Sequence, residues 1–171
     1  KADLDATTWR VNLAYYPTED WTVFFNAGTG FRSGILQSQA QADAVIADGV
    51  PTDISLRPDE LRNIEVGVKG SLLNGALNVA ASVYDVKFTD LQAAFNTSIG
   101  LAAFANQGDG KTQGLDVEVR WETPVEGLSL AAIANVNKSE FTNIVPEFAA
   151  ADPRAGNGQT LFNTPPHNAR V

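Results

Sequence analysis

Three carboxylate side chains recur at short intervals in one stretch of the sequence, namely Asp116, Glu118 and Glu122. If this stretch is a β-strand, all three lie on one face, and Cα atoms two residues apart are about 7 Å from each other. Two carboxyl groups at a short separation can act as acid and base in glycoside hydrolysis. A strand face in contact with water accounts for the same residues more simply, because its charges stay solvated.

A glycine-rich segment suggests a second kind of chemistry. Gly108, Gly110, Lys111 and Thr112 resemble the end of a phosphate-binding loop. That loop requires a further glycine where this sequence has Ala105, and it requires a helix directly afterwards. A strand pattern follows instead, so the sequence does not predict nucleotide binding.

The segment 33–59 is acidic, and carboxylate oxygens are ligands that Ca²⁺ prefers. Ordinary solvation of a loop accounts for the same composition, so the sequence leaves a cation site open without predicting one. The acidic residues concerned are Asp43, Asp48, Asp53 and Asp59.

Composition excludes several other functions. The 171 residues include no cysteine and one histidine, His167, which leaves no thiolate ligands and too few imidazoles for a histidine-built metal centre. The net charge is -8, and the few basic residues are spread along the chain, whereas nucleic-acid binding requires them on one face. The sequence therefore predicts no catalytic residue, no cofactor, no metal and no nucleic-acid partner.

Alternation of apolar and polar residues with period two dominates the sequence and is typical of β-strands. In the clearest segment, 115–122, four apolar residues alternate with four charged ones. An Asn-Gly pair at 74–75 predicts a tight hairpin turn. The register near 84–90 is ambiguous, because apolar residues occur there on both faces. The other segments with this pattern cover about residues 9–15, 21–32, 63–69, 77–88 and 128–137.

The connections between these segments alternate between short and long. Short ones follow Tyr16, Leu73 and Glu122. Such asymmetry is typical of an outer-membrane β-barrel, whose turns are short on the periplasmic side and whose loops are long on the outside. The strands also have the roughly 9 to 11 residues that a membrane-spanning strand needs. The long connections occupy about residues 33–60, 89–110 and 139–164.

Two further features bear on the fold. Residues 37–48, followed by Gly49, have a helix-forming composition and predict a short helix, the only one that the sequence predicts. No run of about 18 apolar residues occurs, so a transmembrane helix is not predicted. Aromatic residues near strand ends beside short turns fit a membrane-interface girdle, with a sandwich core as the alternative. They are Trp9, Trp21, Trp121, Tyr15 and Tyr16.

An ordered series of motifs resembles the TonB-dependent receptors. The first are YYPTEDWTV at 15–23, GFRSG at 30–34, and LRPDE at 56–60 followed by IEVGVKG at 64–70, where Asp59 stands in place of the usual Glu. The resemblance continues through residues 84–92, 106–108, 114–118, 127–130 and 165–167. It covers nearly the whole chain, although no single motif is diagnostic.

The resemblance implies an all-β, up-and-down antiparallel fold in the outer membrane of a Gram-negative bacterium. In that family a barrel of about 22 strands is filled by a plug and imports a ferric siderophore, cobalamin or a glycan. Extracellular loops capture this ligand, and a TonB coupling protein supplies energy through an N-terminal box. No plug, box or C-terminal strand is recognised, so residues 1–171 are expected to form a partial barrel of six to seven strands.

On this interpretation apolar side chains contact outer-membrane lipid and polar ones face the lumen, and the isolated piece self-associates through open edges. Six lumen-facing residues are candidate contacts to ligand or plug. They are Arg32, Glu65, Lys69, Asp116, Glu118 and Arg120. Two alternatives remain, namely a passive porin or structural barrel without a plug, and a soluble β-sandwich binding module. The sandwich predicts that Leu115 and Trp121 are buried.

Overall fold

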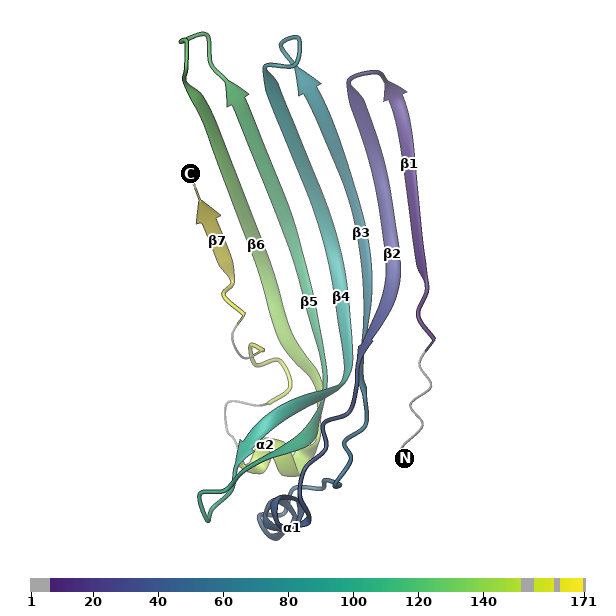
Figure 1. Cartoon of the computed structure of the whole chain (residues 1–171), viewed down its shortest axis with the longest axis vertical. Helices are drawn as coiled ribbons and strands as arrows, with labels where there is room; N and C mark the ends of the chain where they lie inside the picture. Colours follow the sequence, from purple (N-terminus) through teal and green to yellow (C-terminus); the bar gives the residue numbers. More distant parts are fainter. Residues whose placement is uncertain (1–6, 152–155, 162–163, 171) are drawn as a thin grey trace.

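A computed structural model describes residues 7–151, 156–161 and 164–170 and shows one open antiparallel sheet (Figure 1). Seven strands pair in the order in which they occur in the sequence. They are β1 (Arg10–Thr18), β2 (Trp21–Arg32), β3 (Asp59–Leu72), β4 (Leu77–Asn96), β5 (Ala102–Glu122), β6 (Ser129–Ile144) and β7 (His167–Arg170). The predicted all-β, up-and-down architecture is confirmed.

The connections lie at opposite ends of the sheet according to their length. The turns after β1, β3 and β5 lie together at the top of Figure 1, and the long connections lie at the bottom. We call these the turn end and the loop end. Among the described residues, no helix is long and apolar enough to cross a membrane.

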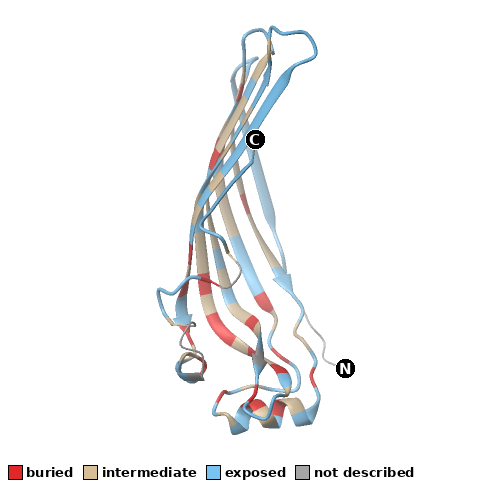
Figure 2. Ribbon diagram, turned by 90° about the vertical axis from the view of Figure 1, so that its left-hand side faces the viewer, coloured by how far each residue is buried: buried red, intermediate tan, exposed pale blue. Residues whose placement is uncertain are grey.

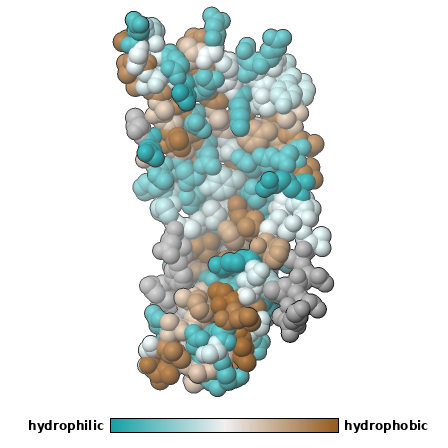
Figure 3. All heavy atoms as spheres, viewed as in Figure 1, coloured by the Kyte–Doolittle hydropathy of each residue, from teal (hydrophilic) through white to brown (hydrophobic). Residues whose placement is uncertain are grey.

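Strand register separates the side chains into two faces. Because directly paired residues share a face, Val66, Val83, Leu115 and Val136 form one row across β3 to β6. We call this side the apolar face and the other the polar face. Figure 3 shows polar side chains across the middle of the sheet in the view of Figure 1.

The β-sandwich alternative is wrong, because the described strands form a single layer and no second sheet among them covers the apolar face. Trp121 is 37% exposed and Leu115 is 43% exposed. Figure 2 shows this layer as a curved ribbon of mostly exposed and half-buried residues.

The hydrophobic core lies at the loop end, as the buried residues in the lower part of Figure 2 indicate. There α1 (Gln39–Ala47) and α2 (Pro146–Ala151) flank the bent ends of β4 and β5 (Figure 1). Their side chains pack with those of β5 and β6 in one cluster. It comprises Val45, Val50, Ala103, Ala105, Phe141, Ile144, Phe148 and Leu161.

The expected long loop at 89–110 is wrong, because β4 and β5 continue through it and pair until Asn96 and Ala102. The pairing shifts after Phe88, and Asp90 has a φ of 55°, so a bulge bends the hairpin. This also resolves the ambiguous register, since β4 pairs regularly with β5 as far as Phe88. Glycine is required at position 108, because φ there is 124° and an added Cβ would overlap a backbone carbonyl of β6.

The predicted helix is confirmed as α1. The hydroxyl of Ser38 accepts from the N–H of Gln41, and the Gln41 side chain accepts from the N–H of Ser38, which forms a capping box. Gly49, with a φ of 83°, follows the C-terminal end. The sequence missed α2, whose six residues are too few for a helical period, although Pro146 at its first position is a usual signal.

The aromatic residues occupy both ends of the apolar face. Trp21 and Trp121 lie at the turn end, as expected. The expectation for Trp9 was wrong, because it precedes β1 at the loop end, where its N–H donates to the Thr29 hydroxyl. Aromatic side chains therefore lie at both the turn end and the loop end of the apolar face, as they do in membrane barrels.

Candidate functional site

The polar face contains an open groove of ≈ 730 Å³ over β1 to β6. Four of the six candidate contact residues line it, namely Glu65, Lys69, Asp116 and Glu118. The structure therefore brings together residues of β3 and β5, two strands that are separated by β4 in the sequence and in the sheet. The groove contains three carboxylates and one ammonium group from this set, so its charge is negative.

The groove is hollow because small residues form its floor. Ala80 and Ser82 of β4 line it directly. At Gly67 an added Cβ would overlap the Phe24 ring, so this ring lies across the glycine backbone. At Gly114 an added Cβ would overlap the Tyr84 hydroxyl in the same way.

A chain of hydrogen bonds crosses β1 to β3 at one side of the groove. The Asn12 amide donates to the Asn26 carbonyl oxygen at 2.7 Å, and the Asn26 amide donates to Glu65 at 3.0 Å. Each of these pairs lies in register on neighbouring strands. Glu65 is therefore held in place by the sheet itself.

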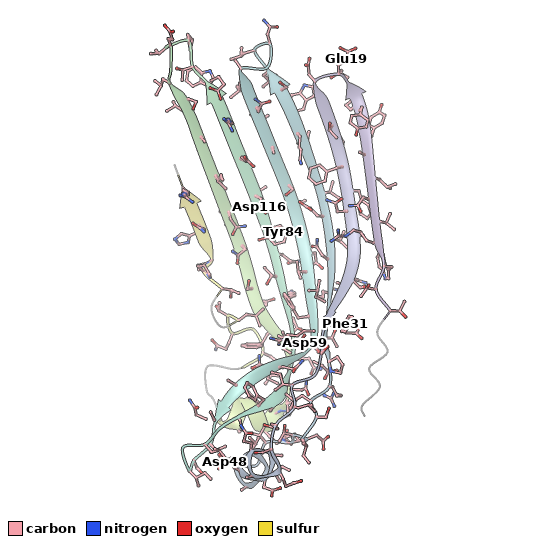
Figure 4. The ribbon with its side chains drawn as sticks, in the orientation of Figure 1. Glu19, Phe31, Asp48, Asp59, Tyr84 and Asp116 are labelled. Carbon is pink, nitrogen blue, oxygen red and sulfur yellow. The ribbon has the colours of Figure 1, made fainter. Side chains whose placement is uncertain are left out.

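A second chain of hydrogen bonds crosses β4 to β6 at the other side. The Asn135 amide donates to Asp116 at 2.5 Å and to the Tyr84 hydroxyl at 3.0 Å. Figure 4 shows Tyr84 and Asp116 on the neighbouring strands β4 and β5. Asn137 donates to Asn135 at 2.7 Å and extends the chain toward the loop end. Asp116 is thus oriented by an amide that the sequence did not identify.

Lys69 and Glu118 differ from the other charged residues of the groove, because neither has a hydrogen-bond or ion-pair partner among the described residues. They lie in one row with Ala80 between them, so their strands are about 10 Å apart at the usual interstrand spacing. The Lys69 ammonium lies 5.3 Å from the centre of the Phe24 ring. An opposing surface that enters the groove can bind both charges.

Arg120 belongs to an adjoining groove of ≈ 340 Å³ nearer the turn end, which it shares with Lys69 and Glu118. Its guanidinium donates to Glu122 at 3.2 Å, two residues along the same strand. The two grooves form a continuous polar surface.

Arg32 lies apart from the other candidates, at the loop end. Its guanidinium forms an ion pair with Asp59, with Nε to Oδ2 at 2.9 Å, and donates to the Gln92 carbonyl oxygen at 3.2 Å. The Gln92 side-chain carbonyl in turn accepts from the N–H of Ile35, and its amide nitrogen donates to Ser33. Gln92 therefore ties the start of the first long loop to β4, and Arg32 links β2 to β3 and β4. Contact of Arg32 with a ligand stays a prediction.

The sequence missed the polar residues that orient these charges. Their signal was alternation on the polar face, where amide and aromatic residues occupy the positions between the charges. They are Asn12, Asn26, Tyr84, Gln92 and Asn135. Which of them meet across strands follows from register, which a single sequence does not supply.

Two of the three carboxylates whose spacing suggested catalysis, and the glycine-rich segment, have structural roles, whereas Glu118 has no hydrogen-bond or ion-pair partner among the described residues. Asp116 and Glu122 are engaged by Asn135 and Arg120. The glycine-rich segment at 108–112 lies inside β5, where no helix follows. In the part of the chain that the structure describes, no three His, Cys, Asp or Glu residues form a group that could hold a metal ion.

Comparisons with known proteins identify the class. The family model of the TonB dependent receptor-like β-barrel matches residues 1–171, and the chain belongs to this family. The family is one of receptors, so the chain is not an enzyme. No curated protein matches the chain in sequence.

Solved structures with the same fold include the ferric yersiniabactin uptake receptor FyuA from Yersinia pestis, with a TM-score of 0.64, 20% identity, and coverage of 94% of this chain and 21% of that one. For the ferric citrate transporter FecA the TM-score is 0.61 at 20% identity, and the match covers 96% of this chain and 22% of that one. For the FrpB iron transporter from Neisseria meningitidis the TM-score is 0.58 at 20% identity, and the match covers 80% of this chain and 20% of that one. The chain spans about a fifth of the length of these structures.

Proposed function

We propose that residues 1–171 form part of the barrel domain of an outer-membrane receptor that takes up a bulky nutrient in a Gram-negative bacterium. The cargo classes are a ferric siderophore, cobalamin or a glycan. The three solved receptors are named for iron or ferric cargo, so ferric chelates are the first class to test. Energy enters through a TonB coupling protein, and the loop end captures the cargo.

The observation that supports this function is the division of one sheet into two faces, in a chain that matches the family along its whole length. An apolar face built of successive rows across the strands suits lipid, and the acidic groove suits a water-filled lumen. We further propose that Lys69 and Glu118 contact the cargo or a plug, because they are the groove charges without a hydrogen-bond or ion-pair partner among the described residues.

Uptake by cells that depend on the complete receptor tests the function. Cells that lack other iron receptors are supplied with one ferric chelate at a time, and accumulation of labelled iron is measured with and without the TonB coupling protein. We expect accumulation that requires both the receptor and the coupling protein. Accumulation that is unchanged without the coupling protein indicates the passive porin alternative and contradicts the proposal.

A matched pair of variants tests the groove. Replacing Lys69 and Glu118 by Gln removes one charge of each sign from the groove, so the net charge of the receptor does not change. We expect slower uptake at an unchanged amount of receptor in the membrane. Replacing Lys138 and Glu126, two exposed charges of opposite sign outside the groove, by Gln is the control and leaves uptake unchanged. Equal effects of both pairs contradict a role of the groove.

A further inference from the structure

The apolar face carries a group of charges where its apolar rows end. Arg62 of β3 pairs in register with Lys87 of β4, and Lys87 pairs with Lys111 of β5. Three cations therefore lie side by side on three adjacent strands. At an interstrand spacing of about 4.8 Å, the outer two are about 10 Å apart.

This arrangement is unfavourable in the sheet alone, because like charges directly opposite each other on neighbouring strands repel. Lys111 has one compensating contact, an ion pair with Glu140 at 2.9 Å, and Glu140 is shared with Lys138 at 2.6 Å. Arg62 and Lys87 are exposed and have no ion-pair partner within the part of the chain that the structure describes.

The carboxylates near this row do not neutralise it. Asp85 lies one row closer to the turn end and accepts from the Gln113 amide at 2.7 Å, and Glu60 lies one row closer to the loop end. In the three rows that contain Glu60, Arg62 and Asp85, four cations face three carboxylates, and in the row of Arg62 itself three cations face one. In a chain with a net charge of -8, this local excess of positive charge is distinctive.

The position of the row defines what can neutralise it. Two residues along each strand toward the turn end lie Ile64, Asp85 and Gln113, and the next row is Val66, Val83 and Leu115. Val66, Val83 and Leu115 are 45%, 56% and 43% exposed. Along the strands, an anion bound by the cations would therefore lie about 14 Å from the first wholly apolar row, given two steps of about 7 Å.

We propose that Arg62, Lys87 and Lys111 bind the phosphate of an anionic lipid in the leaflet at the loop end, with its acyl chains along the apolar face. The proposal rests on the membrane placement proposed above. A lipid suits both the row of cations and the apolar rows next to it, since its phosphate offsets the repulsion between the cations and its chains cover the exposed apolar side chains. Free phosphate suits only the row of cations, and a second copy of the chain presents the same row of cations and would add repulsion.

Native mass spectrometry of the complete, delipidated receptor in detergent tests this proposal. The receptor is titrated with diphosphorylated lipid A, with phosphatidylcholine and with inorganic phosphate. The variant Lys87→Gln with Lys111→Gln removes two cations from the row. The control Lys69→Gln with Arg120→Gln removes two cations from the polar face. A third variant, Lys87→Arg with Lys111→Arg, retains the charge.

We expect the Gln variant of the row to weaken lipid A binding about thirtyfold, since each cation near an anionic lipid surface contributes roughly a factor of five. The Arg variant and the polar-face control retain the affinity of the unmodified receptor, and phosphatidylcholine binding does not respond to any variant. Heat-modifiable mobility on gels confirms that each variant is folded.

Three binding results would overturn the proposal, and so would one result on the oligomeric state. They are equal lipid A binding by the Gln variant and the unmodified receptor, an equal loss in the polar-face control, and displacement of lipid A by inorganic phosphate alone. A dimer that forms in place of the lipid complex would also contradict it. Loss of all lipid binding, phosphatidylcholine included, would instead count against the membrane placement and so against the proposed function.

Discussion

Asp59 joins the loop-end termini of β3 and β2, because it is 8% exposed and accepts hydrogen bonds from the guanidinium of Arg32. Its backbone lies at the start of β3, and Gln92 of β4 completes the network. Two motif residues that lie 27 positions apart in the sequence thus form one ion pair in the structure.

Replacing Asp59 by Asn removes the charge from this ion pair while keeping the shape. We expect the free energy of unfolding to fall by roughly 1.5–3 kcal/mol, because hydrogen bonds to charged groups contribute about this much. Urea-induced unfolding of the complete receptor measures it. Asp43→Asn, in the same loop, is the control, because the only contact described for that carboxylate is to the exposed Gln39. Equal effects of the two changes would refute the role of Asp59.

Asp48 links the end of α1 to the tip of the β4–β5 hairpin, at the bottom of Figure 4. Its carboxylate accepts from the Ser98 hydroxyl at 2.6 Å and from the Ser98 N–H at 2.7 Å. These bonds, the hydroxyl first, hold the pKa of Asp48 below its usual value. A lowered pKa means that the contact stabilises the folded loop above the ordinary pKa and loses this contribution as the pH falls through the lowered value.

We therefore expect the hairpin tip to separate from α1 only as the pH falls through the lowered pKa, below the ordinary aspartate value of about 3.9. Spin labels at Gln39 and Ile99, on cysteines introduced into a chain that has none, report the distance between the two segments. In Asp48→Asn the distance is already longer at neutral pH and does not change with pH. A transition that persists in this variant would assign the response to another group.

At the scale of the strand, the close contacts between aromatic rings and glycines shape the groove. The Tyr84 ring of β4 lies over Gly114 of β5 and also presents its hydroxyl to Asn135 of β6. One ring thus connects three neighbouring strands on the polar face. Cross-strand packing of this kind stabilises a sheet beyond its backbone hydrogen bonds.

Replacing Gly114 by Ala forces the Tyr84 hydroxyl away from its position. We expect a loss of about 1–3 kcal/mol in unfolding free energy, the usual range for overpacking. In a Tyr84→Ala background the same change costs little, so a double-mutant cycle gives the coupling. Gly30→Ala is the control, because its Cβ would contact Leu61 at an ordinary 3.5 Å. Additive effects of Gly114→Ala and Tyr84→Ala would contradict the contact between these two residues.

At the scale of the whole molecule, the single layer exposes both faces of the sheet, and only the nature of the surroundings distinguishes them. The neighbours Ile133 and Ala134 of β6 make a sharp comparison. Ile133 pairs with Glu118 on the polar face, and Ala134 pairs with Val117 on the apolar face. Both residues are exposed.

If the apolar face contacts lipid, Ala134→Arg costs about 2–4 kcal/mol in unfolding free energy near the middle of the membrane. Ile133→Arg changes it by less than about 0.5 kcal/mol, as expected of a site in water. Unfolding of the receptor from phospholipid vesicles measures both values. A larger cost for Ile133→Arg would reverse the assignment of the faces.

The sequence by itself determined the strands near the turn end, their two faces and the helix after Ser38. These depend on local physics, because the pleat has a period of two and a capping box needs only four residues. The sequence also predicted that four of the candidate residues share the polar face, because each occupies a polar position in the two-residue alternation of its strand. They are Glu65, Lys69, Asp116 and Glu118.

Only the tertiary structure decided what lies at the loop end and which charges meet. The segment 89–110 lacks clear alternation, and it extends as a hairpin because α1, α2 and β6 supply its hydrophobic neighbours. Lys87 and Lys111 lie opposite each other because of the register between β4 and β5. Register depends on contacts between strands far apart in the sequence, and a slip of one residue would move every side chain to the other face.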